Sequence, residues 1–187
     1  MTQKKILLLS VSAGAGHMRA AEAIRSHADQ GDSGVSATHL DVMDFVSAGF
    51  RKMYTDFYIQ LVNRAPTLWG YLYQSTHEAR PDSSMERLRR CFERLNTSAL
   101  LKEIERVQPD VIICTHFLPA EILSRLTAKA GFKTPVWVQV TDFDLHRMWV
   151  HDHMAGYFAA TDEVAFRMRH EGIAADRIHV TGIPVMP

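Results

Sequence analysis

A glycine turn joins an apolar run to an alanine-rich segment near the start of this chain. The apolar run Ile6–Leu9 is followed by Ser-Val-Ser-Ala-Gly-Ala-Gly-His at 10–17, and then by alanine-rich residues up to Ala23. A short continuous apolar run bounded by turn residues is typical of a buried strand, whereas apolar residues at three- and four-residue steps are typical of a helix. We therefore predict a strand at 5–11, a glycine turn, and a helix at 17–28.

The same alternation of strand and helix patterns runs through much of the chain. Further strands are predicted at 35–42, 110–114, 135–140, 156–160 and 177–180, and further helices at 119–130 and 162–170. Alternating strands and helices favour a parallel sheet with right-handed connections and helices on both faces. The predicted fold class is therefore α/β, with a Rossmann-like parallel sheet in one domain over residues 1–187.

A helical, aromatic-rich insertion interrupts this alternation at about 43–107. Apolar residues from Phe50 to Val62 follow the amphipathic helix template, and a second long helical pattern covers 85–107. Its aromatic residues have basic neighbours, which suits a lipid or membrane contact, although such a stripe also suits a protein core. The candidate lipid contacts are Tyr54, Phe57, Tyr58 and Trp69.

The composition limits the classes of partner. The formal net charge is zero, which argues against nucleic acid as the main partner because phosphate binding needs a basic surface. The two cysteines, Cys91 and Cys114, have no CxxC spacing, so a reducing compartment is expected. No stretch reaches the roughly 18 apolar residues of a spanning helix. We expect a cytoplasmic protein, peripheral on the cytoplasmic face of the membrane.

The turn Gly14-Ala15-Gly16-His17 is the first candidate binding element. It lies at the carboxyl end of a predicted strand, where ligands of open parallel sheets bind, and helix N-terminal amides favour an anion or a polarised oxygen. Arg19 stands where a dinucleotide GxGxxG motif needs glycine, and no Walker Lys-Ser/Thr follows. The helix dipole would disfavour a charged His17, which makes it a candidate general base. The alternative is a tight turn with an exposed histidine.

The polar stretch 141–153 follows another predicted strand and is the second candidate element. Its aspartates and histidines allow three interpretations: a metal site, a polar ligand-binding loop, or a structural loop. Helical metal-ligand spacing is not present, so we predict neither metal nor cofactor. In the ligand-binding interpretation Trp149 provides an apolar platform. The candidate contacts are Asp142, Phe143, His146 and Trp149.

His116 directly follows the predicted strand 110–114 and is a further candidate at the same edge of the sheet. A ligand contact and a simple strand–helix turn are equally compatible with its position. Ser10 and Ser12 raise the possibility of a hydrolase triad with His17. However, the chain has no Gly-x-Ser-x-Gly elbow, which argues against a hydrolase.

With these residues in view, the chain resembles the N-terminal domain of the monogalactosyldiacylglycerol synthases and processive diacylglycerol glucosyltransferases. The resemblance spans nearly the whole chain, and its motifs occur in the family's order and spacing. They are Gly14-Ala15-Gly16-His17 with Ala20–Ile24, Pro109–His116, Thr141-Asp142-Phe143 with His146 and Trp149–His151, Thr161-Asp162, and Thr181–Val185.

The resemblance implies the N-terminal half of a GT-B fold, which binds the acceptor and meets an anionic membrane surface. It implies inverting transfer of galactose or glucose from a UDP-sugar to the 3-hydroxyl of diacylglycerol, without an essential metal. By the match, His17 is the base, and the candidate residues of 141–153 lie on the acceptor side. Ala15 departs from the plant-type Gly-Gly-Gly-His, and the C-terminal donor-binding domain is expected to be absent.

Two alternatives to this function stay open from the sequence. One keeps the transferase activity but replaces diacylglycerol with a polyprenyl-linked or soluble acceptor. The other is a non-catalytic Rossmann-like module that binds a nucleotide or small anion at the turn Gly14–Gly16.

Overall fold

The computed structural model describes residues 3–12, 14–30, 34–52, 54 and 97–187. Their strands form one six-stranded sheet in which every pair is parallel, in the order β2-β1-β3-β4-β5-β6. The strands are β1 (Lys4–Ser10), β2 (Val35–Asp41), β3 (Val111–Cys114), β4 (Val136–Gln139), β5 (Gly156–Ala159) and β6 (Ile178–Val180).

The chain reverses its direction of growth across the sheet at β1. It first adds β2 on one side of β1, and then adds β3, β4, β5 and β6 in turn on the other side. A crevice at the carboxyl ends of the strands is expected where the order reverses, here between β1 and β3. The backbone ties these two strands together there, since Thr115 N–H donates to Leu9 O at 2.9 Å.

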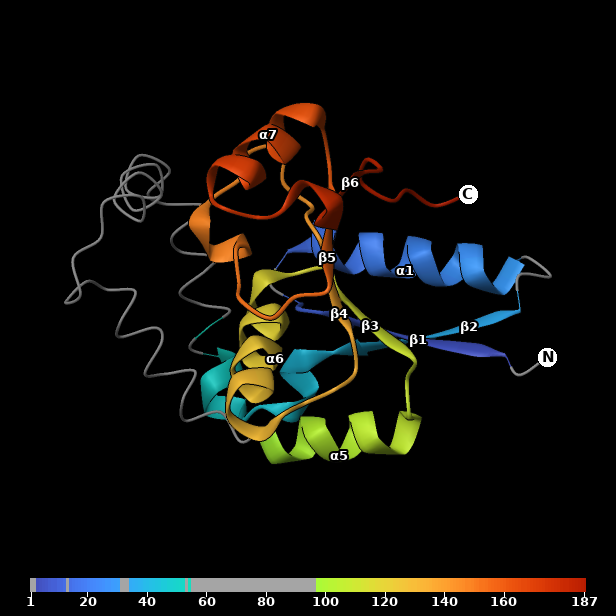
Figure 1. The fold of residues 1–187 in the computed structure, drawn as a ribbon. Coiled ribbons are helices and arrows are strands. Elements are labelled where there is room, and N and C mark those ends of the chain that lie inside the picture. The colour runs from blue at the N-terminus through green and yellow to red at the C-terminus, as the bar shows by residue number, and fades with distance from the viewer. Residues whose placement is uncertain (1–2, 13, 31–33, 53, 55–96) are drawn as a thin grey trace.

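Helices cover both faces of the sheet, as predicted (Figure 1). Helix α1 (Ala15–Gln30) lies on one side, and α5 (Thr97–Val107) and α6 (Phe117–Ala130) lie on the other. Successive residues of β1 point to opposite faces, so Leu8 packs with Ala21 of α1, whereas Leu7 and Leu9 join the larger core. That larger core also contains residues of α5, α6 and α7 (Asp162–His170).

Local signals fix the ends of two helices close to where the sequence predicts them. Thr161 caps α7 by accepting a hydrogen bond from Val164 N–H at 3.2 Å. Gly131 ends α6 with φ 63°, a left-handed conformation that glycine adopts without steric cost. Helix α6 starts at Phe117, two residues before the predicted start, because the side chain of His116 caps it.

The predicted insertion lies largely outside the described residues. Helix α5 confirms the last part of the predicted helical pattern 85–107. Before it, η1 (Val42–Phe45) is a short 3₁₀ helix that follows β2, and Arg51 donates to the carbonyl oxygen of Met43. No helix in the described part of the chain combines the length and the apolar character that a membrane crossing requires.

Candidate functional site

Three loops that follow β1, β3 and β4 meet at the carboxyl edge of the sheet. His17 comes from the turn after β1, Thr115 and His116 follow β3, and Thr141 and Asp142 follow β4. The side chain of His17 contacts residues of both other loops. The structure thus brings the predicted first element together with the other two, at the point where the strand order reverses.

The small residues of the glycine turn leave its backbone accessible at this edge of the sheet. Gly14 has φ 131°, which an L side chain rarely adopts, so glycine is required there for conformation. Gly16 has an ordinary φ, and an added Cβ at this position would meet nothing within 4 Å. Ala15 and Gly16 are exposed in the first turn of α1. Their small size therefore leaves room above the backbone for a ligand.

His17 is held by two hydrogen-bond partners on one ring nitrogen. Its Nδ1 lies 3.1 Å from the carbonyl oxygen of Thr115 and 2.7 Å from Oγ1 of Thr141. Because a carbonyl oxygen only accepts, Nδ1 carries the hydrogen and donates it, which leaves the lone pair of a neutral ring on Nε2. The Thr115 hydroxyl in turn donates to the His17 carbonyl at 2.9 Å. This arrangement fixes both the position and the tautomer of the ring.

The surroundings of His17 favour its neutral form. Burial lowers the pKa of His17 below its ordinary value, while the charge of Asp142 and the Thr115 carbonyl oppose this effect in part. Its place in the first turn of α1 acts in the same direction as burial, because the helix dipole disfavours a cation there. A neutral imidazole with a free Nε2 lone pair can take a proton from a hydroxyl group.

His116 lies entirely inside the protein, against His17. The centroids of the two rings are 4.5 Å apart and the rings meet edge to face. Nδ1 of His116 accepts from Leu118 N–H at 3.0 Å, and its buried Nε2 has no hydrogen-bond partner among the described residues. Burial, with a smaller effect from His17 and His146, holds the pKa of His116 well below its ordinary value. A neutral His116 supports His17 without adding a charge beside it.

Trp149 is also fully buried and anchors the loop 141–153 from inside. Its indole Nε1–H donates to Asp142 Oδ2 at 2.7 Å, and its ring centroid lies 6.1 Å from that of His17. His146 is 4% exposed, and its Nε2 lies 3.8 Å from the same Asp142 oxygen. In this structure the predicted apolar platform is an internal support that orients Asp142, rather than a free ring face.

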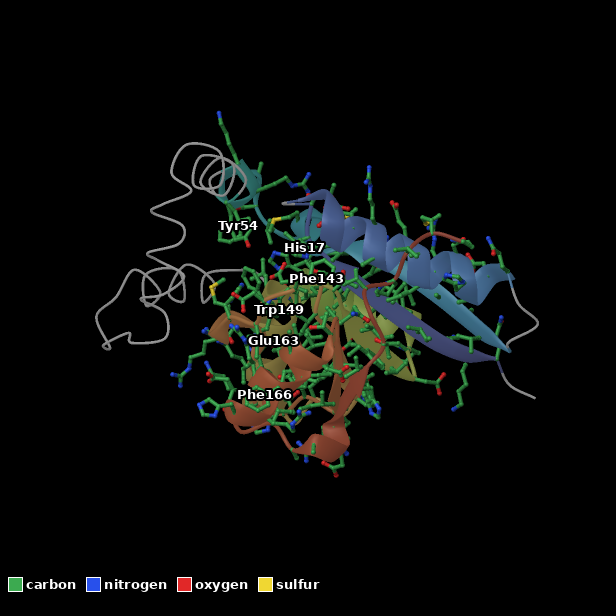
Figure 2. All side chains as sticks on the ribbon, turned by 90° about the horizontal axis from the view of Figure 1, so that it is seen from above. His17, Tyr54, Phe143, Trp149, Glu163 and Phe166 are labelled. Atoms are coloured by element: carbon green, nitrogen blue, oxygen red, sulfur yellow. The ribbon has the colours of Figure 1, made fainter. Side chains whose placement is uncertain are left out.

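Phe143 is the candidate contact that reaches solvent. Its side chain is 73% exposed, and Figure 2 shows it in the same region of the molecule as His17 and Trp149. The next acidic residue, Asp144, forms an ion pair with Arg167 of α7, which joins the loop to that helix. An exposed phenylalanine on the loop that carries Asp142, at the edge of the sheet where His17 lies, is suited to contact an apolar part of a ligand.

The sequence did not point to the half-buried contact between His151 and Glu121 that holds the far end of this loop. His151 Nδ1 lies 2.9 Å from Glu121 Oε2 of α6, and Arg125 of the same helix binds the other Glu121 oxygen. The hydrogen bond from His151, aided by Arg125, lowers the pKa of Glu121 to about 2. The i,i+4 spacing of Glu121 and Arg125 was a visible signal, but their contact with His151 depends on the tertiary fold.

The remaining predicted site residues are placed as follows. Among the described residues, no three or more of His, Cys, Asp or Glu are grouped so as to hold a metal ion. Tyr54 is 6% exposed and stacks on Phe50 with ring centroids 5.9 Å apart, which favours the core alternative for this residue. Phe57, Tyr58 and Trp69, the other candidate lipid contacts, lie outside the described residues.

Two bacterial relatives match nearly the whole chain. A processive diacylglycerol beta-glucosyltransferase of Bacillus cytotoxicus is 28% identical over 181 residues, which are 97% of this chain and 45% of that protein. An uncharacterized glycosyltransferase of Bacillus subtilis, YkoN, is 27% identical over 183 residues, 97% of this chain and 48% of that protein. The chain thus spans less than half the length of each relative.

Solved structures confirm the fold. The lipopolysaccharide outer core galactosyltransferase WaaB matches with a TM-score of 0.56 and 12% identity, over 94% of this chain and 44% of that one. The UDP-GlcNAc 2-epimerase from Neisseria meningitidis matches with a TM-score of 0.52 and 15% identity, over 96% of this chain and 46% of that one. The predicted Rossmann-like domain of the GT-B type is therefore confirmed.

The family predicted from the sequence motifs is confirmed by a family model. The model for monogalactosyldiacylglycerol (MGDG) synthase matches residues 17–185, which begin at His17 and include the loops that follow β3 and β4. The match therefore covers His17 and the two loops that bind it, and it begins directly after the glycine turn. On this evidence the chain belongs to the MGDG synthase family.

Proposed function

We propose that this chain is the acceptor-binding part of a glycolipid-forming glycosyltransferase, in which His17 takes the proton from the acceptor hydroxyl. The observation that carries the proposal is the fixed His17 ring, whose Nδ1–H is bound by Thr115 and Thr141 while Nε2 keeps its lone pair. Membership of the MGDG synthase family and the likeness to processive diacylglycerol glucosyltransferases support diacylglycerol as the acceptor and a UDP-sugar as the donor.

The chemistry follows from the charge that develops on the acceptor oxygen. As that oxygen bonds to the anomeric carbon of the UDP-sugar, the bond from this carbon to the diphosphate oxygen breaks and UDP leaves with the electron pair. The O–H bond of the acceptor breaks in the same step, and Nε2 of His17 accepts the proton. The resulting imidazolium keeps its Nδ1–H bond to the Thr115 carbonyl and lies in the field of Asp142, both of which favour the charged form. The open glycine turn admits the glycerol hydroxyl, and Phe143 contacts the apolar part of the lipid.

Binding of the acceptor is tested directly on the 187-residue chain with a soluble, short-chain diacylglycerol. Saturable shifts of the NMR signals of His17, Phe143 and the amides at 14–16 are expected. A short-chain triacylglycerol is the matched control, because a third acyl chain replaces its hydroxyl, so it has no O–H group that could donate to Nε2. Equal binding of both lipids would contradict the proposed acceptor site. Thermal stabilisation of the chain by UDP-sugars but not by diacylglycerol would also contradict it and would favour a nucleotide-binding module.

The role of His17 is tested in a chimera in which this chain replaces the matched segment of the Bacillus cytotoxicus relative. His17→Ala is expected to lower transfer by about 10²–10⁴-fold, the usual contribution of a general base. The control is His39→Ala, since His39 is a half-buried histidine of β2 that is hydrogen-bonded to Ser10. An active chimera that keeps its rate after His17→Ala would exclude the base assignment.

Membrane association is part of the same proposal, at an anionic surface on the cytoplasmic face. The exposed side chains of Phe143 and Phe166 support it from the described residues, as does the diacylglycerol in the name of the Bacillus cytotoxicus relative. Co-sedimentation with vesicles that contain anionic lipid and diacylglycerol is the test, with pure phosphatidylcholine vesicles as the control. Failure to sediment with the anionic vesicles would count against membrane association while leaving the His17 assignment intact.

A further inference from the structure

An open cavity lies at the amino edge of the sheet, opposite to the edge that carries His17. Its lining comes from residues just before β4, just before β5 and just before β6, together with the end of α6. Its volume is about 440 Å³, within the range of about 300–1,000 Å³ that is common for ligand sites. The lining residues are Thr127, Phe132, Lys133, Thr134, Pro135, His153, Met154, Ala155 and Arg177.

The charged groups of this cavity are all basic. Lys133 and Arg177 carry positive charge, His153 carries it when protonated, and no acidic side chain is among the lining residues. Within the part of the chain that the structure describes, neither Lys133 nor Arg177 forms an ion pair with a carboxylate. Asp152 and Asp176 adjoin His153 and Arg177 in sequence but do not line the cavity.

One threonine hydroxyl adds a hydrogen-bond donor to the two basic groups of the cavity. Thr134 donates to no group in the described residues, so its hydroxyl is available to a ligand. Thr127 already donates to the Leu123 carbonyl at 2.9 Å and can only accept. His153 has φ 62°, an uncommon conformation outside glycine, and Ala155 N–H is bound to Val136 O at 2.7 Å, so the loop that carries His153 is anchored beside the cavity.

We propose that this cavity binds a phosphate group, either of a soluble metabolite or of a lipid headgroup. A guanidinium group and an ammonium group without carboxylate partners, with a free hydroxyl beside them, are the donors that bind a dianionic phosphate in proteins. The cavity is larger than a phosphate ion, so it has room for a glycerol or sugar moiety attached to the phosphate. This site lies on the opposite edge from His17 and does not depend on the proposed function.

NMR titration of the 187-residue chain with inorganic phosphate, at constant ionic strength, tests the site. Saturable shifts are expected at the amides of 132–134 and 153–155. The double substitution Lys133→Ala/Arg177→Ala is expected to weaken binding at least about tenfold, the loss of one good charge-assisted contact. Lys102→Ala/Arg169→Ala is the matched control, because it removes the same charges from exposed positions that do not line the cavity.

Several results would overturn this inference. They are equal phosphate affinity in the chain and in the Lys133→Ala/Arg177→Ala variant, equal weakening in both double variants, or acetate binding as tight as phosphate. Circular dichroism establishes that each variant is folded. If the Lys133→Ala/Arg177→Ala variant fails to fold, the single substitutions Lys133→Gln and Arg177→Gln provide the same test, since they preserve most of the side-chain volume.

Two further ligands identify the source of the phosphate group. Glycerol 3-phosphate represents a soluble metabolite, and phosphatidylcholine vesicles with added phosphatidic acid represent a lipid headgroup. If Lys133→Ala/Arg177→Ala weakens glycerol 3-phosphate binding but leaves vesicle binding unchanged, the ligand is soluble. If Lys133→Ala/Arg177→Ala also weakens vesicle binding and Lys102→Ala/Arg169→Ala does not, the site binds a lipid headgroup. If Lys133→Ala/Arg177→Ala weakens binding of neither glycerol 3-phosphate nor the vesicles, the phosphate proposal fails.

Discussion

His17 depends on residues far away in the sequence for its chemical state. The glycine turn places it at the strand edge, but the Thr115 carbonyl and the Thr141 hydroxyl decide which nitrogen carries the hydrogen. Burial and the charge of Asp142 act on its pKa in opposite directions, with burial the larger effect. The pKa of His17 therefore reflects two opposing effects, and a single substitution that removes one of them can shift it.

Asp142→Asn is expected to lower the pKa of His17 further. The carboxylate favours the imidazolium, so its removal takes away an effect that raises the pKa of His17, and the lowering by burial is then less opposed. Asparagine keeps an oxygen that can accept from Trp149 Nε1–H, so the loop should keep its structure. NMR titration of the His17 ring measures the shift. An unchanged or higher pKa would show that Asp142 does not act on His17 through its charge.

His116 is expected to make the protein less stable in mild acid. Its pKa is held low in the folded protein, whereas the unfolded chain takes up a proton near pH 6.5, so the unfolded state binds more protons below that pH. His116→Asn keeps a side-chain oxygen that can cap α6 and removes this effect. Urea unfolding should show a pH slope that is lower by up to about 1.4 kcal/mol per pH unit below about pH 6, the value for one bound proton.

The control for His116 is His116→Leu, which removes the cap as well as the titration. It should lose about 1 kcal/mol at every pH in addition to the flattened slope. If the pH dependence of stability is the same in His116→Asn and in the unsubstituted protein, the buried ring is protonated in the folded state, contrary to its surroundings.

Among the secondary-structure elements, β5 has a glycine, Gly156, where the side chain of Trp137 on the neighbouring strand β4 lies over its backbone. A Cβ added at Gly156 would lie 2.3 Å from a ring carbon of Trp137, which occupies the neighbouring position on β4. The same indole stacks on Phe158 with ring centroids 5.0 Å apart. Gly156 is therefore required because the tryptophan fills the space above it.

Gly156→Ala is expected to destabilise the protein by about 2–3 kcal/mol, the cost of overpacking a fixed contact. Adding Trp137→Leu should recover part of this loss, with a coupling of at least about 1 kcal/mol in a double-mutant cycle. Gly16→Ala is the control, since a Cβ there meets nothing within 4 Å. Additive effects of the two substitutions, measured by chemical denaturation, would contradict the proposed contact.

The ends of the elements show what local sequence determines. Gly131 and Thr161 act through bonds to their own helices, so their roles could be predicted from sequence. The first turn of α1 begins at Ala15, two residues before the predicted start, because Gly16 is helical despite its low helix propensity. The burial of Trp149 could not be predicted, because an aromatic residue in a polar loop is compatible with either an exposed or a buried ring.

At the scale of the whole molecule, the strand order sets the pattern of stability. β1 is paired on both sides, with β2 and β3, and its residues Leu7–Leu9 are fully buried, whereas β6 is an edge strand with exposed residues. We expect the slowest amide hydrogen exchange in β1 and β3 and much faster exchange in β6. Exchange monitored by mass spectrometry or NMR measures this gradient. Equal protection of β6 and β1 would indicate that further contacts cover the β6 edge.

The alternation of strands and helices, the family motifs and the residues at each strand end can be predicted from the amino-acid sequence alone, as can the caps at Gly131 and Thr161. These follow from periodicity and from turn chemistry, which act within a few residues of the chain. The position of β1 between β2 and β3, which brings His17 to Thr115 and Thr141, becomes visible in the folded chain alone. Strand neighbours are selected by packing between distant segments, and periodicity carries no information about which apolar strands pair.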